Sequence, residues 1–184
     1  MNISPTEAAD ALRDIADSAD RSREFKGYRI AAPYFFLWGA IWILGYGATG
    51  VSLRAAILWL PLTVIGIGVS AYLGWRNSRR FATGKAWGKR MFGMFVVIAL
   101  FITATYAILP PHNQLQTGAF SALISALMYS IVGLWTYRRY LWLGIFLGAA
   151  TMFGFFFLTA WFSFWMAVIG GGALILTGFW MRKA

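Results

Sequence analysis

The chain has 184 residues, of which 60% are hydrophobic, 18% are aromatic and only 12% are charged, and its formal net charge is +10. This composition lies outside the averages of soluble domains and indicates an all-α, polytopic membrane protein. The absence of cysteine excludes disulfides, thiol catalysis and thiolate metal sites.

The first 30 residues form a polar tail that contains every acidic residue of the chain. Ser4, Pro5 and Glu7 supply an N-cap, a proline at the first helical position and an acid at the third, so a helix is predicted to start here and to run towards Glu24. Placed at 100° per residue, five of its six acids fall on one face, and apolar residues fall on the opposite face, namely Ala8, Ala11, Leu12, Ile15 and Ala19.

A helix that lies flat on an anionic bilayer carries Lys and Arg on its polar face, and this tail carries acids instead. We therefore expect a cytoplasmic amphipathic helix that binds a protein partner through Glu7, Asp10, Leu12, Asp14, Ile15 and Asp17. A solvated or partly disordered tail is the alternative.

Residues 31–184 are predicted to form a membrane domain of six transmembrane helices. A helix needs about 20 mostly apolar residues to cross the ~30 Å hydrocarbon core. Four apolar runs have this length: Ala32–Val51, Ala55–Trp75, Met91–Leu109 and Thr117–Tyr137. The uncharged run Leu141–Met181 has 41 residues, enough for two helices, and we divide it near Ala160–Ser163.

A glycine near the start of each odd-numbered span is followed by a tryptophan near the end of the next span. The pairs are Gly39 and Trp75, Gly93 and Trp135, and Gly144 and Trp180. Such a recurrence predicts three tandem helical hairpins. Tryptophan followed by basic residues is also common wherever a helix ends at the cytoplasmic interface, so repetition and coincidence are both open.

The basic residues lie almost entirely on one side of the predicted spans. Twelve Lys and Arg from Lys26 onwards share one side, and Arg54 alone lies on the other. By the positive-inside rule both termini are predicted to be cytoplasmic. The compact size and strong charge bias suit a bacterial-type inner membrane, and an organelle membrane is the alternative.

The loop between the second and third spans is the most basic segment. Its cations are expected to bind anionic lipid headgroups or to dock the acidic tail; they are Arg76, Arg79, Arg80, Lys85, Lys89 and Arg90. Trp87 and Phe81 lie among them, and aromatic residues among cations are also seen in proteins that bind single-stranded nucleic acid. Because the loop lies between two membrane-spanning helices, lipid is favoured and no nucleic-acid partner is predicted.

Small residues at four-residue spacing predict where helices pack closely in a membrane. They are Gly118, Ala122 and Ala126 in the fourth span and Gly144 and Gly148 in the fifth. These contacts are expected within the bundle or between copies of the chain in a homo-oligomer.

No catalytic, cofactor or metal site is predicted. No span contains Asp, Glu, His, Lys or Arg near its centre, which argues against carboxylate-coupled transport. His112 is the single histidine, too few for paired haem ligands or an internal zinc site.

The sequence therefore predicts a non-enzymatic membrane protein that acts as a sensor, regulator or accessory subunit through its tail and basic loop. The alternative is a small uncoupled transporter or channel for a neutral or hydrophobic solute. An enzyme acting on lipid would need a nucleophile and base that the spans do not group together.

Overall fold

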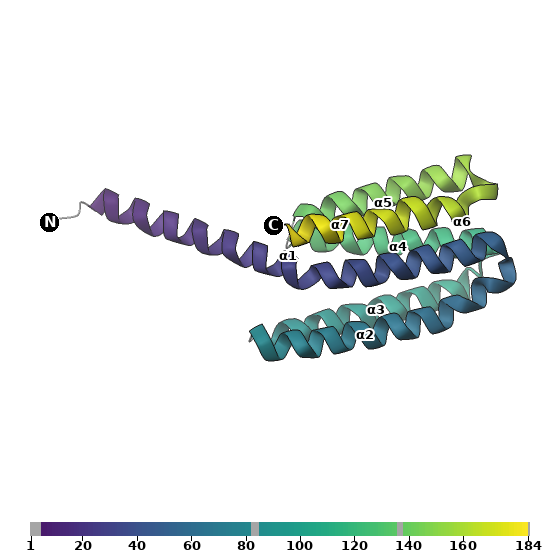
Figure 1. Ribbon diagram of the computed structural model, residues 1–184, viewed down its shortest axis with the longest axis horizontal. Helices are drawn as coiled ribbons and strands as arrows, with labels where there is room; N and C mark the ends of the chain where they lie inside the picture. The colour runs from purple at the N-terminus through teal and green to yellow at the C-terminus, as the bar shows by residue number, and fades with distance from the viewer. Residues whose placement is uncertain (1–4, 82–84, 136–137, 184) are drawn as a thin grey trace.

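The computed structural model describes residues 5–81, 85–135 and 138–183, and within these ranges it contains helices and no strand. The elements in chain order are α1 (Pro5–Val51), η1 (Leu53–Leu58), α2 (Trp59–Phe81), α3 (Lys85–Ile108), α4 (Gln114–Trp135), α5 (Arg138–Phe157), η2 (Thr159–Trp161), α6 (Phe162–Trp165), η3 (Met166–Gly170) and α7 (Gly171–Arg182). The last three follow one another as a single rod along the bundle (Figure 1).

Five helical segments of the described chain are long and apolar enough to cross a membrane: Glu24–Val51, Leu53–Ser78, Gln114–Trp135, Arg138–Phe157 and Thr159–Arg182. The all-helical, multi-pass character of the prediction is therefore confirmed. In α3 the apolar stretch that could be searched is shorter, Val96–Ile108. The sixth span thus stays a prediction.

The first helix is longer than expected. It begins at Pro5, as the capping pattern predicts, but it does not end near Glu24 and continues for 47 residues to Val51. Neither Gly27 nor Pro33 interrupts it, although Pro33 has no N–H to donate to the carbonyl four residues earlier. The segment predicted as a separate tail is therefore the first half of the helix that enters the bundle.

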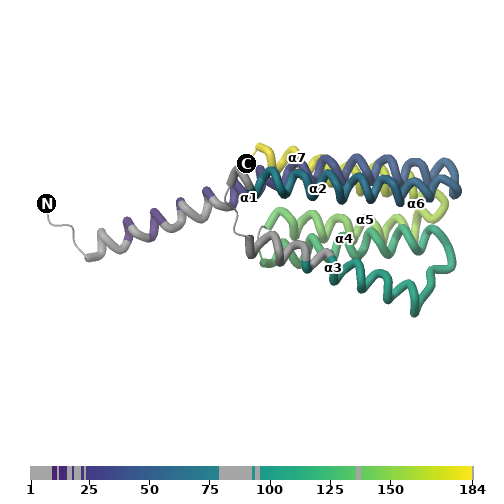
Figure 2. The backbone as a smooth tube through the Cα atoms, turned by 90° about the horizontal axis from the view of Figure 1, so that it is seen from below, coloured from purple at the N-terminus to yellow at the C-terminus, as the bar shows by residue number. Residues whose placement is uncertain are grey.

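The core is formed by α1, α4, α5 and the α6–α7 rod. Ala122, Leu147, Met166 and Leu174 are fully buried between these helices. By contrast, α2 is mostly exposed and lies beside α1, as Figures 1 and 2 both show. Figure 2 separates α3 from α2, and the C-terminal end of α3 contacts α4 through Tyr106, whose hydroxyl donates a hydrogen bond to the carbonyl of Thr117.

The closest helix pairs are α1 with α7 and α4 with α5. Neither pair is one of the three predicted tandem hairpins, so that arrangement stays unconfirmed. The break between the last two spans lies at Leu158, where the backbone leaves the helical region (φ −125°, ψ 39°), and one 3-10 turn follows. The predicted turn at Ala160–Ser163 overlaps the end of this connection.

Candidate functional site at the junction of arm and bundle

The first half of α1 projects from the bundle as a single helix, which we call the arm (residues 5–23). Figure 1 shows no other element beside it. Among its described side chains, Asp10, Asp14, Ser18 and Ser22 are exposed, and Ile15 is 66% exposed. The arm therefore offers acidic and apolar groups to its surroundings without packing on the rest of the chain.

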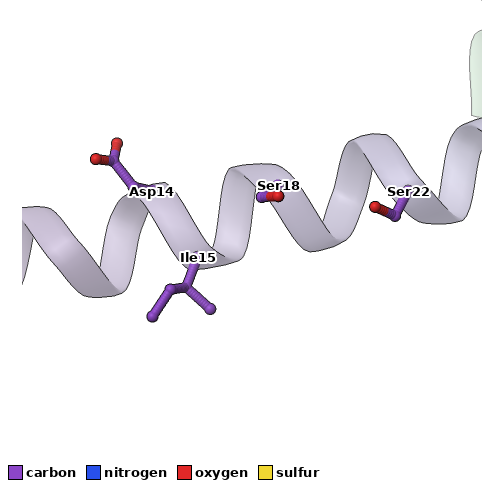
Figure 3. Close-up of a pocket in the computed structure, with 4 residues that line it drawn as sticks. All are labelled: Asp14, Ile15, Ser18 and Ser22. Carbon is purple, nitrogen blue, oxygen red and sulfur yellow. The ribbon is translucent and has the colours of Figure 1, made fainter.

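A shallow hollow on the arm is lined by Asp14, Ile15, Ser18 and Ser22. Figure 3 shows that all four side chains come from one stretch of one helix, with no second element facing them. Ligand sites are concave and bury most of the ligand. This hollow cannot enclose a small molecule, and only a surface of another molecule could cover it.

The arm meets the bundle at a cluster of four side chains from three helices, Glu24 and Tyr28 of α1, Arg139 of α5 and Trp180 of α7. We call it the junction cluster. Tyr28 is only 2% exposed, and its hydroxyl donates a hydrogen bond of 2.7 Å to Oε1 of Glu24. Glu24 is the last acid of the chain. The acidic arm is thus joined to the first buried side chain of the bundle.

Arg139 completes the junction cluster from the opposite side. Its guanidinium lies 4.5 Å from the centroid of the Tyr28 ring and 4.6 Å from that of Trp180. Both distances are within the range of cation–π contacts, which contribute about 0.5–2 kcal/mol each depending on exposure. One cation therefore bridges aromatic side chains of α1 and α7.

The same guanidinium also closes the end of α7. Nη1 of Arg139 donates a hydrogen bond of 2.7 Å to the carbonyl of Trp180. α7 ends at Arg182, so this carbonyl belongs to the last turn, where carbonyls lack partners within the helix. A cation at this end is also favoured by the helix dipole.

Inside the bundle, two buried threonines are bonded to their own helices. Thr49 donates to the carbonyl of Gly45 and Thr151 to that of Leu147, each four residues earlier. Over the described residues, no buried side-chain nitrogen or oxygen lacks a hydrogen-bond partner. Those residues also include no group of three His, Cys, Asp or Glu that could hold a metal ion.

Tyr46 of α1 packs against aromatic side chains of other helices. The Tyr46 ring makes edge contacts with Trp42, Trp59 and Phe162, and its hydroxyl donates a hydrogen bond of 2.8 Å to the carbonyl of Gly118. Tyr46 itself fills the space between these rings. This aromatic group therefore joins α1 to α2, α4 and α6.

Of the partner-binding residues predicted on the tail, Asp10, Asp14 and Ile15 are exposed on the arm, while the side chains of Glu7, Leu12 and Asp17 lie outside what the structure describes. Of the six cations predicted in the basic loop, only Arg76 has a described side chain, and it is exposed. The side chains of Arg79, Arg80, Lys85, Lys89 and Arg90 are outside the described set. The docking of tail and loop therefore stays a prediction.

The predicted packing residues lie between α4, α5 and α1. A Cβ on Gly144 would meet the backbone of Ser130 and Ala126 in α4, whereas one on Gly148 would lie 3.8 Å from the Ala126 side chain. Ala122 is fully buried, and Gly118 accepts the hydrogen bond from Tyr46.

The sequence interpretation assigned Arg139 to the positive side of the membrane and Trp180 to an interfacial belt. It did not single out Tyr28. No sequence signal joins these residues, because the contacts depend on how α5 and α7 pack against α1.

Comparison with protein families, characterised proteins and solved structures gives no match.

Proposed function

We propose that this protein is a non-enzymatic accessory or regulatory subunit of a bacterial-type inner membrane, and that its arm docks a cytoplasmic protein. The observation that carries the proposal is the exposure of Asp10, Asp14 and Ile15 on a helix that continues unbroken into the bundle. The arm, residues 5–23, reaches about 28 Å beyond the bundle at a rise of about 1.5 Å per residue. That distance suits contact with a soluble partner above the headgroups.

The chemistry of the arm indicates the kind of partner. Ile15 and Leu12 lie three residues apart and so share a face, with acids beside them. Amphipathic helices of this kind bind in apolar grooves. A groove with an apolar floor and a Lys- or Arg-rich rim would complement this arm.

The membrane topology is part of the proposal. With α3 as a sixth span, both ends of the chain lie on the side that carries twelve of the basic residues counted from Lys26 onwards, and this side is the cytoplasm. Figure 1 supports this arrangement, since the end of α7 lies beside the point where α1 enters the bundle.

The test is crosslinking and mild-detergent purification from native membranes, followed by mass spectrometry. We expect a protein that copurifies with the full chain, is lost when residues 2–24 are deleted, and is weakened by Ile15→Ser and by Asp14→Asn. Arg13→Gln is the control on the same helix, because Arg13 is exposed, does not line the hollow and lies two residues before Ile15, on the opposite side of the helix; it should retain the partner. Because ion pairs at an exposed surface weaken with salt, retention should also fall as salt is raised.

If the deletion and the substitutions leave the same proteins bound, the arm is not the docking element. Solute flux in proteoliposomes with the purified chain alone would instead favour the transporter or channel.

A further inference from the structure

A groove of about 330 Å³ runs between α5 and the η3–α7 segment on the outside of the bundle. Its walls are apolar and include Trp142 and Phe146 of α5, Val168 of η3, and Gly172, Leu176 and Trp180 of α7. All but Gly172 are well exposed. Since α5 and the rod containing α7 are both candidate spans, the groove faces the bilayer.

The groove has the length of one leaflet. From Trp180 at one end to Val168 at the other, the chain advances about 18 Å along the helix axis. This is a little more than half of the ~30 Å hydrocarbon core. The groove therefore begins at one membrane interface and ends near the middle of the bilayer.

Basic residues stand at the interfacial end of the groove. Arg138 lies four residues before Trp142, and Lys183 lies three residues after Trp180, so each falls on the groove-facing side of its helix. Both are exposed. Residues 25–184 contain no Asp or Glu, so no side-chain carboxylate of the membrane domain competes for these cations.

We propose that this groove holds one acyl chain of an anionic phospholipid, whose phosphate is bound by Arg138 and Lys183. The apolar groove would hold the acyl chain of the lipid, and the two cations would bind its anionic headgroup. The tryptophans at the mouth, Trp142 and Trp180, lie at the depth where amphipathic rings are favoured.

A second copy of the chain is a less favourable occupant. Packing two copies about a twofold axis along this groove would bring the same basic ends together. With no Asp or Glu in residues 25–184, no side chain of the membrane domains would neutralise them. An anionic lipid supplies the missing negative charge.

The groove can be filled by a substitution, because Gly172, which has no side chain, forms part of its wall. A Cβ at Gly172 would meet nothing within 4 Å, so this position has room for the start of a larger side chain that enters the groove. Gly68 on α2 also has nothing within 4 Å of its Cβ and is far from the groove in sequence and fold. Gly68→Phe is therefore the matched control for Gly172→Phe.

The experiment uses the full chain in vesicles that contain phosphatidylglycerol or phosphatidylcholine with a photoreactive group in the acyl chain. Crosslinked residues are mapped by mass spectrometry. We expect phosphatidylglycerol to label α5 and α7 along the groove, and this labelling to fall several-fold in Gly172→Phe but not in Gly68→Phe. Thermal unfolding of both variants in detergent checks that the fold is kept.

Binding of the headgroup is tested by a second pair of variants. Arg138→Gln should lower the preference for phosphatidylglycerol over phosphatidylcholine by about fivefold, the effect of one cation near an anionic surface. Arg182→Gln, which removes the same charge two residues after Trp180 and so on another side of α7, should lower it less.

Equal labelling by the two lipids in the unsubstituted chain would overturn the proposal that the groove prefers an anionic headgroup. Labelling that Gly172→Phe leaves unchanged would overturn the groove as the acyl-chain site. Crosslinks from one copy of α7 to another in place of lipid labelling would overturn the lipid in favour of a second copy.

Discussion

The guanidinium of Arg139 lies 4.5 Å from the centre of the Tyr28 ring, and so joins the start of α5 to the point where α1 enters the bundle. The same side chain bonds the carbonyl of Trp180 at the end of α7. Three helices that are distant in sequence are therefore held together at one end of the bundle by one cation.

Replacing this cation should loosen the junction cluster. Arg139→Met removes two cation–π contacts and one charged hydrogen bond, and we expect the free energy of unfolding to fall by about 1–3 kcal/mol. Arg139→Lys keeps the charge but not the planar fork, so its loss should be intermediate. Thermal unfolding in detergent measures both.

Arg182→Met is the control for this pair, since Arg182 is exposed and outside the junction cluster. A second readout follows the arm itself. Because the chain has no cysteine, spin labels at Ser18→Cys and at a position in the bundle report their separation, and the distance distribution should broaden in Arg139→Met. A distribution that stays unchanged would show that the arm is held by something other than Arg139.

The two glycines of the GxxxG in α5 should differ in their tolerance to alanine. A Cβ on Gly144 would lie 2.5 Å from the backbone nitrogen of Ser130 and 2.6 Å from the carbonyl of Ala126, so α4 and α5 must move apart. Overpacking of this kind costs about 1–3 kcal/mol. Gly148→Ala meets only the Ala126 side chain at 3.8 Å and should be nearly neutral. Equal unfolding temperatures for the two variants would contradict the close approach of these helices.

Tyr46→Phe tests the link between α1 and α4. It removes the hydrogen bond of 2.8 Å to the Gly118 carbonyl and keeps the ring contacts, so we expect a loss of about 0.5–1.5 kcal/mol. Tyr46→Ala also removes the ring from a buried aromatic group and should cost about 3–5 kcal/mol. Denaturant or thermal unfolding ranks the two, and a larger effect for Phe than for Ala would be inconsistent with this packing.

The proposed topology is tested by two single cysteines. A reagent that does not cross membranes should label His112→Cys only from outside the cytoplasm and Ser22→Cys only from the cytoplasm, because loop and arm lie at opposite ends of the spans. Labelling of His112→Cys from the cytoplasm alone would reverse the assignment.

The sequence predicts the membrane-spanning helices well where apolar length decides the outcome. The runs that include Trp42, Ser70, Ala126 and Leu147 all lie in helices that the structure shows to be long and apolar. Capping chemistry likewise places the start of α1 at Pro5. Both signals are local, so they can be read without knowing which helices are neighbours.

What the sequence could not predict depends on packing between helices. The continuation of α1 past Glu24 is one example, because the change from polar to apolar composition there is typical of a boundary although the helix crosses it. The junction cluster was missed because Tyr28, Arg139 and Trp180 lie far apart along the chain. The packing of α1 against α7 brings together the two ends of the sequence, and no local signal indicates it.

Pro33 lies five residues beyond Tyr28 on the same helix, and its ring removes the hydrogen bond that residue 33 would donate to the carbonyl of Arg29. The missing hydrogen bond is thus on the bundle side of Tyr28, which Arg139 holds against α5 and α7. If a partner binds the arm as proposed, a pull on the arm reaches the contacts of Tyr28 with Arg139 before it reaches Pro33. These contacts would then protect the first span from unwinding at Pro33.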